Sequence, residues 1–317
     1  MAPIFTIVGA TGLQGGSVLQ AALKSGLYDI RVITRNTSSE KAKQLQARGV
    51  EVVAADLNSE ESLMKAFEGS TAIFGLTNFF EHFPKLDPAA AISLEVKQGQ
   101  NLANAAAKTL NLKHYIWSTL PDTEKLSNGK ISVPHHQGKA QIDSYIKENE
   151  ELYAKTTFLW IGPYAQNFEY PWTKPSFFET VGKYIQLGPV PPTTIVQTIG
   201  DVHTNVGLFT SAILAQPLLT KGKYVLGVVE ETTVGELVKI WGQTTGKNTM
   251  YVEIASVEEY DKLWPVWGTE IGLMMKFWEI AGKGAWSGEG VVTKEDLGLS
   301  EEMFVDSKET FRKMSWD

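Results

Sequence analysis

Short apolar runs alternate with longer amphipathic segments over the first half of the chain. The short runs are rich in β-branched residues and predict six strands, at about 4–8, 30–34, 50–55, 71–76, 113–118 and 156–161. Between them, apolar residues recur every three or four positions, which is typical of helices. Units repeated in this order predict a doubly wound, parallel α/β sheet of the Rossmann type, which binds ligands beyond the carboxyl ends of its strands.

Several local signals predict where helices begin and end. Gly26 follows a helical pattern and suits a left-handed C-terminal cap. Asn58 with Glu61, and Thr233 with Glu236, resemble the capping box that starts a helix. The stretch 77–88, which holds three phenylalanines and two prolines, is expected to be a loop. Further helices are expected at about 39–48, 89–108 and 137–148.

The regular alternation of strands and helices ends after Gly162, and positions 163 to 192 contain six prolines. We therefore expect a nucleotide-binding domain over residues 1–162. Residues 163–317 are expected to form a smaller, irregular α/β lobe that is interleaved with the first sheet and binds the substrate. Four tryptophans between positions 264 and 286 are most simply the core of this lobe.

A glycine-rich turn stands where the first strand should end and the first helix begin. Its glycines are Gly9, Gly12 and Gly15. In this pattern one glycine permits a tight turn, one lets the backbone approach a diphosphate, and one allows close packing of helix on sheet. We therefore expect the turn, including Thr11, Leu13 and Gln14, to bind a dinucleotide; the alternative is a purely structural turn.

The end of the second strand indicates which dinucleotide binds. Folds that bind NAD usually place an acidic residue there, whereas this chain has Arg35, which can hold a 2′-phosphate with two hydrogen bonds. NADP(H) is therefore the expected cofactor, unless Arg35 is only a surface residue. Asp56, followed by Leu57, closes the third strand and either faces the adenine or caps the next helix. Thr77 and Asn78 follow the fourth strand and should line the cofactor.

Several motifs together resemble the NmrA-like family of atypical short-chain dehydrogenase/reductases, especially its fungal members. The ordered set is more specific than the glycine turn alone, and it spans nearly the whole chain. Its parts are Gly-Ala-Thr-Gly-Leu-Gln-Gly-Gly at 9–16, Thr-Arg-Asn at 34–36, Ala-Ala-Asp-Leu at 54–57, Leu-Thr-Asn-Phe-Phe at 76–80, Gln-Gly-Gln-Asn-Leu-Ala at 98–103, Pro-His-His-Gln-Gly-Lys-Ala at 134–140, Gly-Pro-Tyr-Ala-Gln-Asn-Phe at 162–168, Trp-Ser-Gly-Glu at 286–289 and Thr-Lys-Glu-Asp-Leu-Gly at 293–298.

The resemblance also shapes the expected reaction site. Ordinary short-chain dehydrogenases use Tyr-x-x-x-Lys, but this chain has His135-x-x-x-Lys139 at the matching place. The resemblance implies that Lys139 contacts the nicotinamide ribose and can serve as proton donor; a solvated helix lysine is the alternative. His135 lies on the same face of the predicted helix and is a second candidate donor. Water is a third.

Residues that follow the fifth and sixth strands complete the expected site. Ser118 should contact the cofactor and Thr119 the substrate, although both could simply cap the end of a strand. Pro163, Tyr164 and Asn167 should border the nicotinamide, with Tyr164 also facing the substrate. Aromatic residues near the cleft favour a flat hydrophobic ligand, and Phe79, Phe80 and Trp172 are expected to contact the substrate; the alternative for each is a place in the core.

Composition narrows the classes of partner. The net charge is −7 and no basic run is present, which argues against nucleic acid. Without any cysteine, disulfides and thiolate metal sites are excluded, and no metal is expected. No apolar run is long enough for a membrane span, so the cytoplasm is the expected location. The oligomeric state stays open.

Three functions are compatible with these observations. The leading expectation is an NADPH-dependent reductase of a small hydrophobic or aromatic ketone, enone or imine, which the resemblance places in fungal secondary metabolism. A second is a non-catalytic NADP(H)-sensing regulator that binds a protein partner. A third is a non-redox enzyme, such as an isomerase, that uses the same cofactor pocket.

Overall fold

A seven-stranded parallel sheet forms the centre of the computed structural model, which describes residues 2–288 and 290–316. Glu289, the last residue of one family-like motif, lies outside the described residues. The strand order is β10-β6-β5-β4-β1-β2-β3, as expected for a Rossmann sheet. The strands are β1 (Ile4–Ile7), β2 (Asp29–Thr34), β3 (Glu51–Ala54), β4 (Ser70–Gly75), β5 (His114–Thr119), β6 (Thr156–Ile161) and β10 (Lys223–Gly227).

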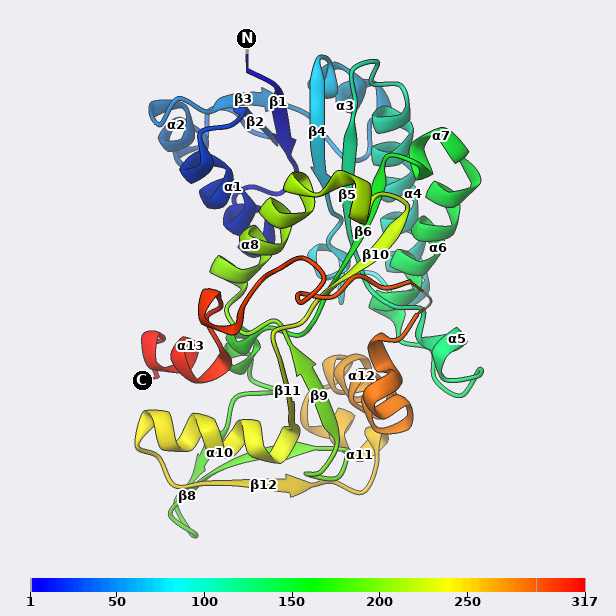
Figure 1. Ribbon diagram of the computed structural model, residues 1–317. Helices are drawn as coiled ribbons and strands as arrows, with labels where there is room; N and C mark the ends of the chain where they lie inside the picture. Colours follow the sequence, from blue (N-terminus) through cyan, green and yellow to red (C-terminus); the bar gives the residue numbers. More distant parts are fainter. Residues whose placement is uncertain (1, 289, 317) are drawn as a thin grey trace.

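Helices cover both faces of this sheet (Figure 1). Apolar residues of β1 and β2 pack on one face against α1 (Leu13–Ser25), α2 (Glu40–Ala47) and α8 (Val202–Ala215). The opposite face packs against α3 (Glu60–Phe67), α4 (Pro88–Ala107), α6 (Pro134–Glu148) and α7 (Glu150–Tyr153). Alternate side chains of a strand point to opposite faces, so the two clusters are separate cores.

The strand β10 and the helix before it were not expected from the sequence. The chain leaves the sheet after β6; α8 begins at Val202, and β10, which begins at Lys223, pairs in parallel with β6. The return is made by α8, which packs so closely on α1 that a Cβ on Gly207 would lie 2.5 Å from the carbonyl oxygen of Ser17. The second half of the chain therefore contributes both to the large sheet and to the small lobe.

Two of the predicted helix ends agree with the structure, and a third does not. Gly26 has a φ of 63° and caps α1 in the left-handed conformation, which confirms that prediction. The side chain of Thr233 accepts from the backbone of Glu236 at the start of α10 (Val234–Thr245), as predicted. The predicted cap at Asn58 is wrong, because Ser59 caps α3 instead. Asn58 is turned away and donates to Asp56.

The remaining elements build a smaller lobe below the large sheet in Figure 1. It contains a mixed three-stranded sheet, ordered β12-β8-β7, and the antiparallel pair β9 and β11. Its strands are β7 (Ser176–Phe178), β8 (Lys183–Gly188), β9 (Ile195–Thr198), β11 (Glu230–Thr233) and β12 (Thr249–Glu253); its helices, besides α10, are α11 (Val257–Leu263), α12 (Trp267–Ala281) and α13 (Ser307–Lys313).

Short helical turns connect the larger elements. They are η1 (Phe79–Glu81), α5 (Thr123–Leu126), η2 (Ala165–Glu169), α9 (Pro217–Thr220), η3 (Gly282–Trp286) and η4 (Glu301–Met303). The turn η1 interrupts the stretch expected to be a plain loop, and the side chain of Asn78 caps it. In the part of the chain that the structure describes, no helix is both long and apolar enough to cross a membrane.

Candidate functional site

One cavity of about 840 Å³ lies where the carboxyl ends of the central strands face the small lobe. The glycine turn lines one part of it, and aromatic side chains from both lobes line another. It also contains most of the residues expected from the sequence: Gly9, Thr11, Gly12, Leu13, Gln14, Gly15, Arg35, Asp56, Leu57, Thr77, Asn78, Phe80, His135, Pro163, Tyr164, Asn167 and Trp172.

The glycine turn has the geometry that a diphosphate requires. Gly9 has a φ of +67°, a conformation that residues with side chains rarely adopt, and its carbonyl accepts from the backbone of Gly12 at 2.9 Å. A Cβ on Gly15 would lie only 2.3 Å from that carbonyl oxygen. The helix α1 begins at Leu13, and no described side chain caps its N-terminus. Its first amides can therefore meet an anion.

Gln14 ties the turn to the ends of two other strands. Its amide nitrogen donates to the hydroxyl of Tyr164 at 2.5 Å, and its amide oxygen accepts from Ser118 at 2.6 Å. Ser118 therefore acts on the site through Gln14 and does not itself line the cavity. Tyr164 does line it, and burial raises the pKa of its hydroxyl.

Two charged side chains, Arg35 and Asp56, line the part of the cavity beside the glycine turn. We call this part the adenosine end of the cavity. The guanidinium of Arg35 forms an ion pair with Glu81 of η1 at 2.5 Å, and 66% of the Arg35 side chain is exposed. Asp56 accepts from the backbone and side chain of Asn58, at 2.8 and 2.9 Å. Asp56 thus orders the loop that precedes α3, but it does not cap that helix.

Aromatic rings surround the opposite end of the cavity, which we call the aromatic chamber. The rings of Trp172 and Trp267 stack at 4.2 Å with an interplanar angle of 10°. Tyr170 extends this stack on one side, and Phe80 extends it on the other. The aromatic side chains that line the chamber are Phe80, Tyr164, Tyr170, Trp172, Trp267, Trp278 and Trp286. Such a chamber suits a flat, apolar molecule.

Three members of the chamber correct an expectation from the sequence. Trp267, Trp278 and Trp286 belong to the tryptophan group that was expected only to form the core of the small lobe. Trp278 and Trp286 are indeed buried in that core, but all three also line the cavity. Trp267 and Trp278 lie on α12 and Trp286 ends η3, and spacing along the chain does not predict that these elements reach the cavity wall.

His135 stands between the two ends of the cavity. It lies in the first turn of α6, and its ring packs 5.2 Å from that of Phe80. Its Nδ1 and its backbone amide both meet the carboxylate of Glu270, which projects from the first turn of α12. The side chains of His135 and Glu270 are only 7% and 2% exposed. This pair therefore crosses from one lobe to the other.

Lys139 lies behind the wall of the cavity and is not among the lining residues. Its Nζ donates to the carbonyl oxygen of Thr77 at 2.9 Å and to the hydroxyl of Thr77 at 2.8 Å. The carboxylate of Glu95 is 3.4 Å away and also accepts from the Thr77 hydroxyl. Burial lowers the pKa of Lys139, while Glu95 opposes that shift. The ammonium group thus holds the end of β4 in place.

Two expected substrate contacts also lie behind the wall. Phe79 packs against Phe83 and Ala91 in a small cluster of its own, because the turn η1 directs Phe80, and not Phe79, into the chamber. Thr119 is 1% exposed and donates to Asp143 at 2.7 Å. Both positions support the site from behind and are covered by other side chains.

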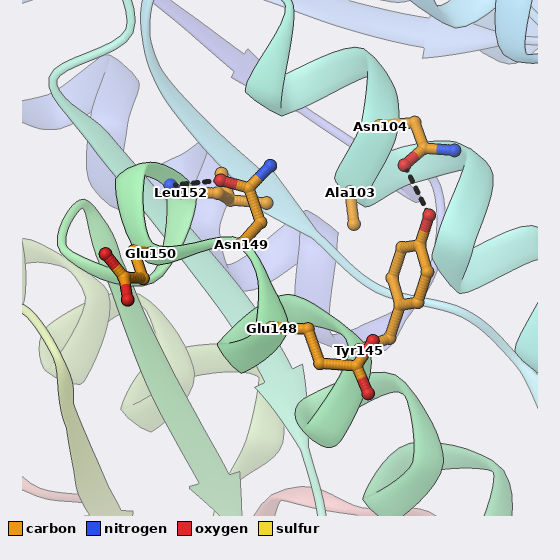
Figure 2. Close-up of a pocket in the computed structure, with 7 residues that line it drawn as sticks. All are labelled: Ala103, Asn104, Tyr145, Glu148, Asn149, Glu150 and Leu152. Carbon is orange, nitrogen blue, oxygen red and sulfur yellow. Dashed lines mark hydrogen bonds between the residues drawn. The ribbon is translucent and has the colours of Figure 1, made fainter.

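A second hollow, of about 450 Å³, lies on the outer helices (Figure 2). Residues of α4, α6 and α7 line it, and these helices meet there near the amino end of β6, far from the strand ends that form the main cavity. Figure 2 shows Tyr145 donating to Asn104, so its central polar groups satisfy each other. Its two glutamates are exposed. The hollow has neither the position nor the donors of a ligand site in this fold.

Comparison with known proteins agrees with this architecture. The model of the NmrA-like family matches residues 3–297. An NmrA-like family domain-containing protein of Dictyostelium discoideum is 30% identical over 276 residues, which cover 86% of this chain and 85% of that protein. An NmrA-like family domain-containing oxidoreductase of Aspergillus hancockii is 28% identical over 271 residues, which cover 81% and 77%.

A solved structure shows the same fold. The crystal structure of NmrA, a negative transcriptional regulator, in complex with NADP matches this chain with a TM-score of 0.75 and 19% identity. The match covers 98% of this chain and 95% of the other. The sequence motifs that resemble the NmrA-like family therefore lie in a chain that has the Rossmann-type fold predicted from them.

Proposed function

The chain belongs to the NmrA-like family, and we propose that it is an NADPH-dependent oxidoreductase that reduces a small, hydrophobic, aromatic metabolite. The observation that carries the proposal is the continuity of the cavity, because the glycine turn and the aromatic chamber line the same hollow. A dinucleotide on the turn would extend towards the chamber, where a flat acceptor fits. The oxidoreductase name of the Aspergillus relative supports the same class.

The residues of the turn and of the adenosine end fit NADP(H). A Cβ on Gly15 would clash with the backbone, so the tight turn depends on this glycine and leaves the first amides of α1 facing the cavity. Arg35 supplies a cation where the 2′-phosphate of the adenosine ribose would lie, and no described carboxylate replaces it at the end of β2. The NADP in the NmrA crystal structure agrees with this assignment.

A bound nicotinamide supplies hydride to the acceptor, and the chain orients the acceptor and excludes water. The stacked rings of Tyr170, Trp172, Trp267 and Phe80 form one continuous apolar wall, against which a planar molecule can lie. Gln14 fixes the hydroxyl of Tyr164 at the border between the two ends of the cavity. Lys139 fixes Thr77, and through it the strand end that would hold the nicotinamide end of the cofactor.

Cofactor consumption tests the proposal. The purified protein should oxidise NADPH in the presence of aromatic ketones, enones or imines, followed by the loss of NADPH absorbance. Calorimetry should show tighter binding of NADPH than of NADH. Silence with every acceptor, together with equal affinity for reduced and oxidised cofactor, would overturn the enzyme and favour an NADP(H)-sensing regulator that binds a protein partner.

A further inference from the structure

A buried histidine and glutamate face each other across the two lobes. The Oε1 of Glu270 accepts from the backbone amide of His135 at 3.1 Å and also meets Nδ1 of the same residue. The same carboxylate oxygen accepts from the backbone amide, and this geometry favours the tautomer in which Nδ1 also donates to it. No described protein group hydrogen-bonds Nε2, while the ring lines the cavity. The second ring nitrogen is thus left for a molecule in the cavity.

Among the described neighbours of the His135 ring, Glu270 is the carboxylate that contacts it. From its own helix, His136 contacts the ring at 4.6 Å, and burial lowers the pKa of His136 well below its usual value. His136 therefore stays neutral beside it. From η1, only the rings of Phe79 and Phe80 approach. From α12, Glu270 is the ionisable group that faces His135, and its carboxylate contacts Nδ1 of the ring.

The other candidate donors near the chamber are less suitable. The ammonium of Lys139 is bonded to Thr77, lies beside Glu95 and does not line the cavity. Tyr164 lines the cavity, but burial raises its pKa, which makes it a weaker acid. His135 alone combines access to the cavity with a carboxylate that holds its far nitrogen.

We propose that His135 donates the proton of the reduction and that Glu270 is its positioning residue, which makes the substrate a neutral conjugated ketone or enone. This inference rests on the proposed function. In the step, hydride would leave the reduced nicotinamide, which becomes oxidised, and form a bond to the electrophilic carbon of the acceptor, while the π electrons of the carbonyl move to its oxygen. That oxygen takes the proton from Nε2. The imidazolium becomes neutral and regains a proton from water, while Glu270 stays ionised.

The charges of the cavity support a neutral acceptor. Its lining carboxylates, Asp56 and Glu81, both lie at the adenosine end. In the chamber, the described lining has no acidic side chain to pair with a preformed cation. A preformed iminium would also need no proton, because hydride addition alone completes its reduction. A buried acid-positioning pair is useful only when the acceptor must be protonated.

Two acceptors with the same bicyclic frame separate the proton from the hydride. α-Tetralone requires both, whereas the N-methyl-dihydroisoquinolinium cation requires hydride alone. In wild-type protein both should be reduced with NADPH. His135→Gln should lower kcat for the ketone by roughly a hundredfold or more, and Glu270→Gln by about tenfold or more, with KM unchanged. Both variants should reduce the cation at the wild-type rate, and Glu270→Asp should restore part of the ketone activity.

A matched variant and a measurement without cofactor complete the test. Glu279→Gln makes the same change on the exposed side of α12 and should behave as wild type. Nitrogen NMR of histidine-labelled protein without cofactor should show Nδ1 of His135 protonated in a strong hydrogen bond, which Glu270→Gln weakens and Glu279→Gln preserves.

The outcomes separate the two proposals. Two results would overturn the proton-donor role without contradicting the proposed reductase. One is an equal loss of ketone and cation reduction in His135→Gln, and the other is no loss in His135→Gln or in Glu270→Gln. An Nδ1 without its proton would overturn the positioning role of Glu270. Failure of the wild-type protein to reduce either probe would overturn the proposed function, together with the substrate class inferred here.

Discussion

The ion pair between Arg35 and Glu81 predicts that the protein restrains its own affinity for NADPH. The guanidinium that should bind the 2′-phosphate already has a carboxylate at 2.5 Å. A phosphate that arrives there must displace or share that partner, and it also meets the charge of Glu81. Glu81→Gln removes both obstacles without changing the size of the side chain. We expect this variant to bind NADPH more tightly than wild type, while its affinity for NADH stays the same.

The magnitude follows from exposure. The side chains of Arg35 and Glu81 are 66% and 38% exposed, so the pair itself contributes at most about 1 kcal/mol. Repulsion between Glu81 and a phosphate at a similar distance in water adds roughly another 1 kcal/mol or less. Glu81→Gln should therefore tighten NADPH binding by up to roughly thirtyfold. Arg35→Ala removes a charge-assisted contact of about 1.5–3 kcal/mol, which corresponds to a loss of roughly ten- to 150-fold.

Calorimetry with NADPH and NADH on both single variants and the double variant checks this reasoning. In the Arg35→Ala background, Glu81→Gln should gain less than in wild type, because there is no ion pair left to break. High salt should shrink every difference. Glu61→Gln is the matched control, because Glu61 is also an exposed glutamate in an ion pair, formed with Lys65 on the same face of α3. An unchanged ratio of NADPH to NADH affinity in both single variants would refute the role of Arg35.

Other predictions concern the turn and the buried charges. Gly15→Ala should abolish NADPH binding because its Cβ would lie 2.3 Å from a carbonyl oxygen of the turn, whereas Gly16→Ala, with its nearest such contact at 3.5 Å, should bind normally in the same calorimetric assay. Lys139→Met should lower the free energy of unfolding by about 3 kcal/mol, because Glu95 is left buried and unpaired; adding Glu95→Gln should restore part of it in urea titrations. Burial raises the pKa of Asp143 to about 7 in the folded protein. In the unfolded chain the same carboxyl ionises near pH 4, so the free energy of unfolding falls as pH rises from about 4 to 7. Asp143→Asn should therefore gain roughly 2 kcal/mol over wild type between pH 5 and pH 8 in thermal unfolding, and a constant difference would contradict that pKa.

Local patterns were sufficient to predict the six strands of the first half of the sheet and the turn that joins the first strand to its helix. Each depends on residues that are close in sequence, such as the glycines from Gly9 to Gly15. The strand β10 was missed because its pairing partner, β6, lies about 60 residues earlier along the chain. Its residues form a short apolar run after Gly222, like the strands of the first half, but the sequence does not show which edge of which sheet that run joins.

The same limit explains which site residues were found. Arg35 follows β2 directly, and a general rule for parallel sheets places such residues at the ligand. Glu270 is 135 residues away from His135 and is preceded by no motif. Lys139 was expected at the ligand, yet the extra space left by Gly138 admits Glu95, and this buried carboxylate holds the lysine behind Thr77. Pairing between buried charges decided both cases, and it depends on tertiary packing.

The two lobes contribute different residues to the cavity, and this difference affects substrate specificity. The large lobe supplies the glycine turn and Arg35, which any protein with this fold can share, and it supplies the ring of His135. The small lobe supplies Trp267 and Glu270 from the first turn of one helix, α12. A change in the position of that helix would therefore alter the width of the chamber and the orientation of the imidazole together. Substrate fit and proton delivery are coupled through α12, whereas cofactor affinity is not. Substitutions that shift the whole of α12 should accordingly change kcat and KM for the acceptor together and leave the dissociation constant of NADPH unchanged.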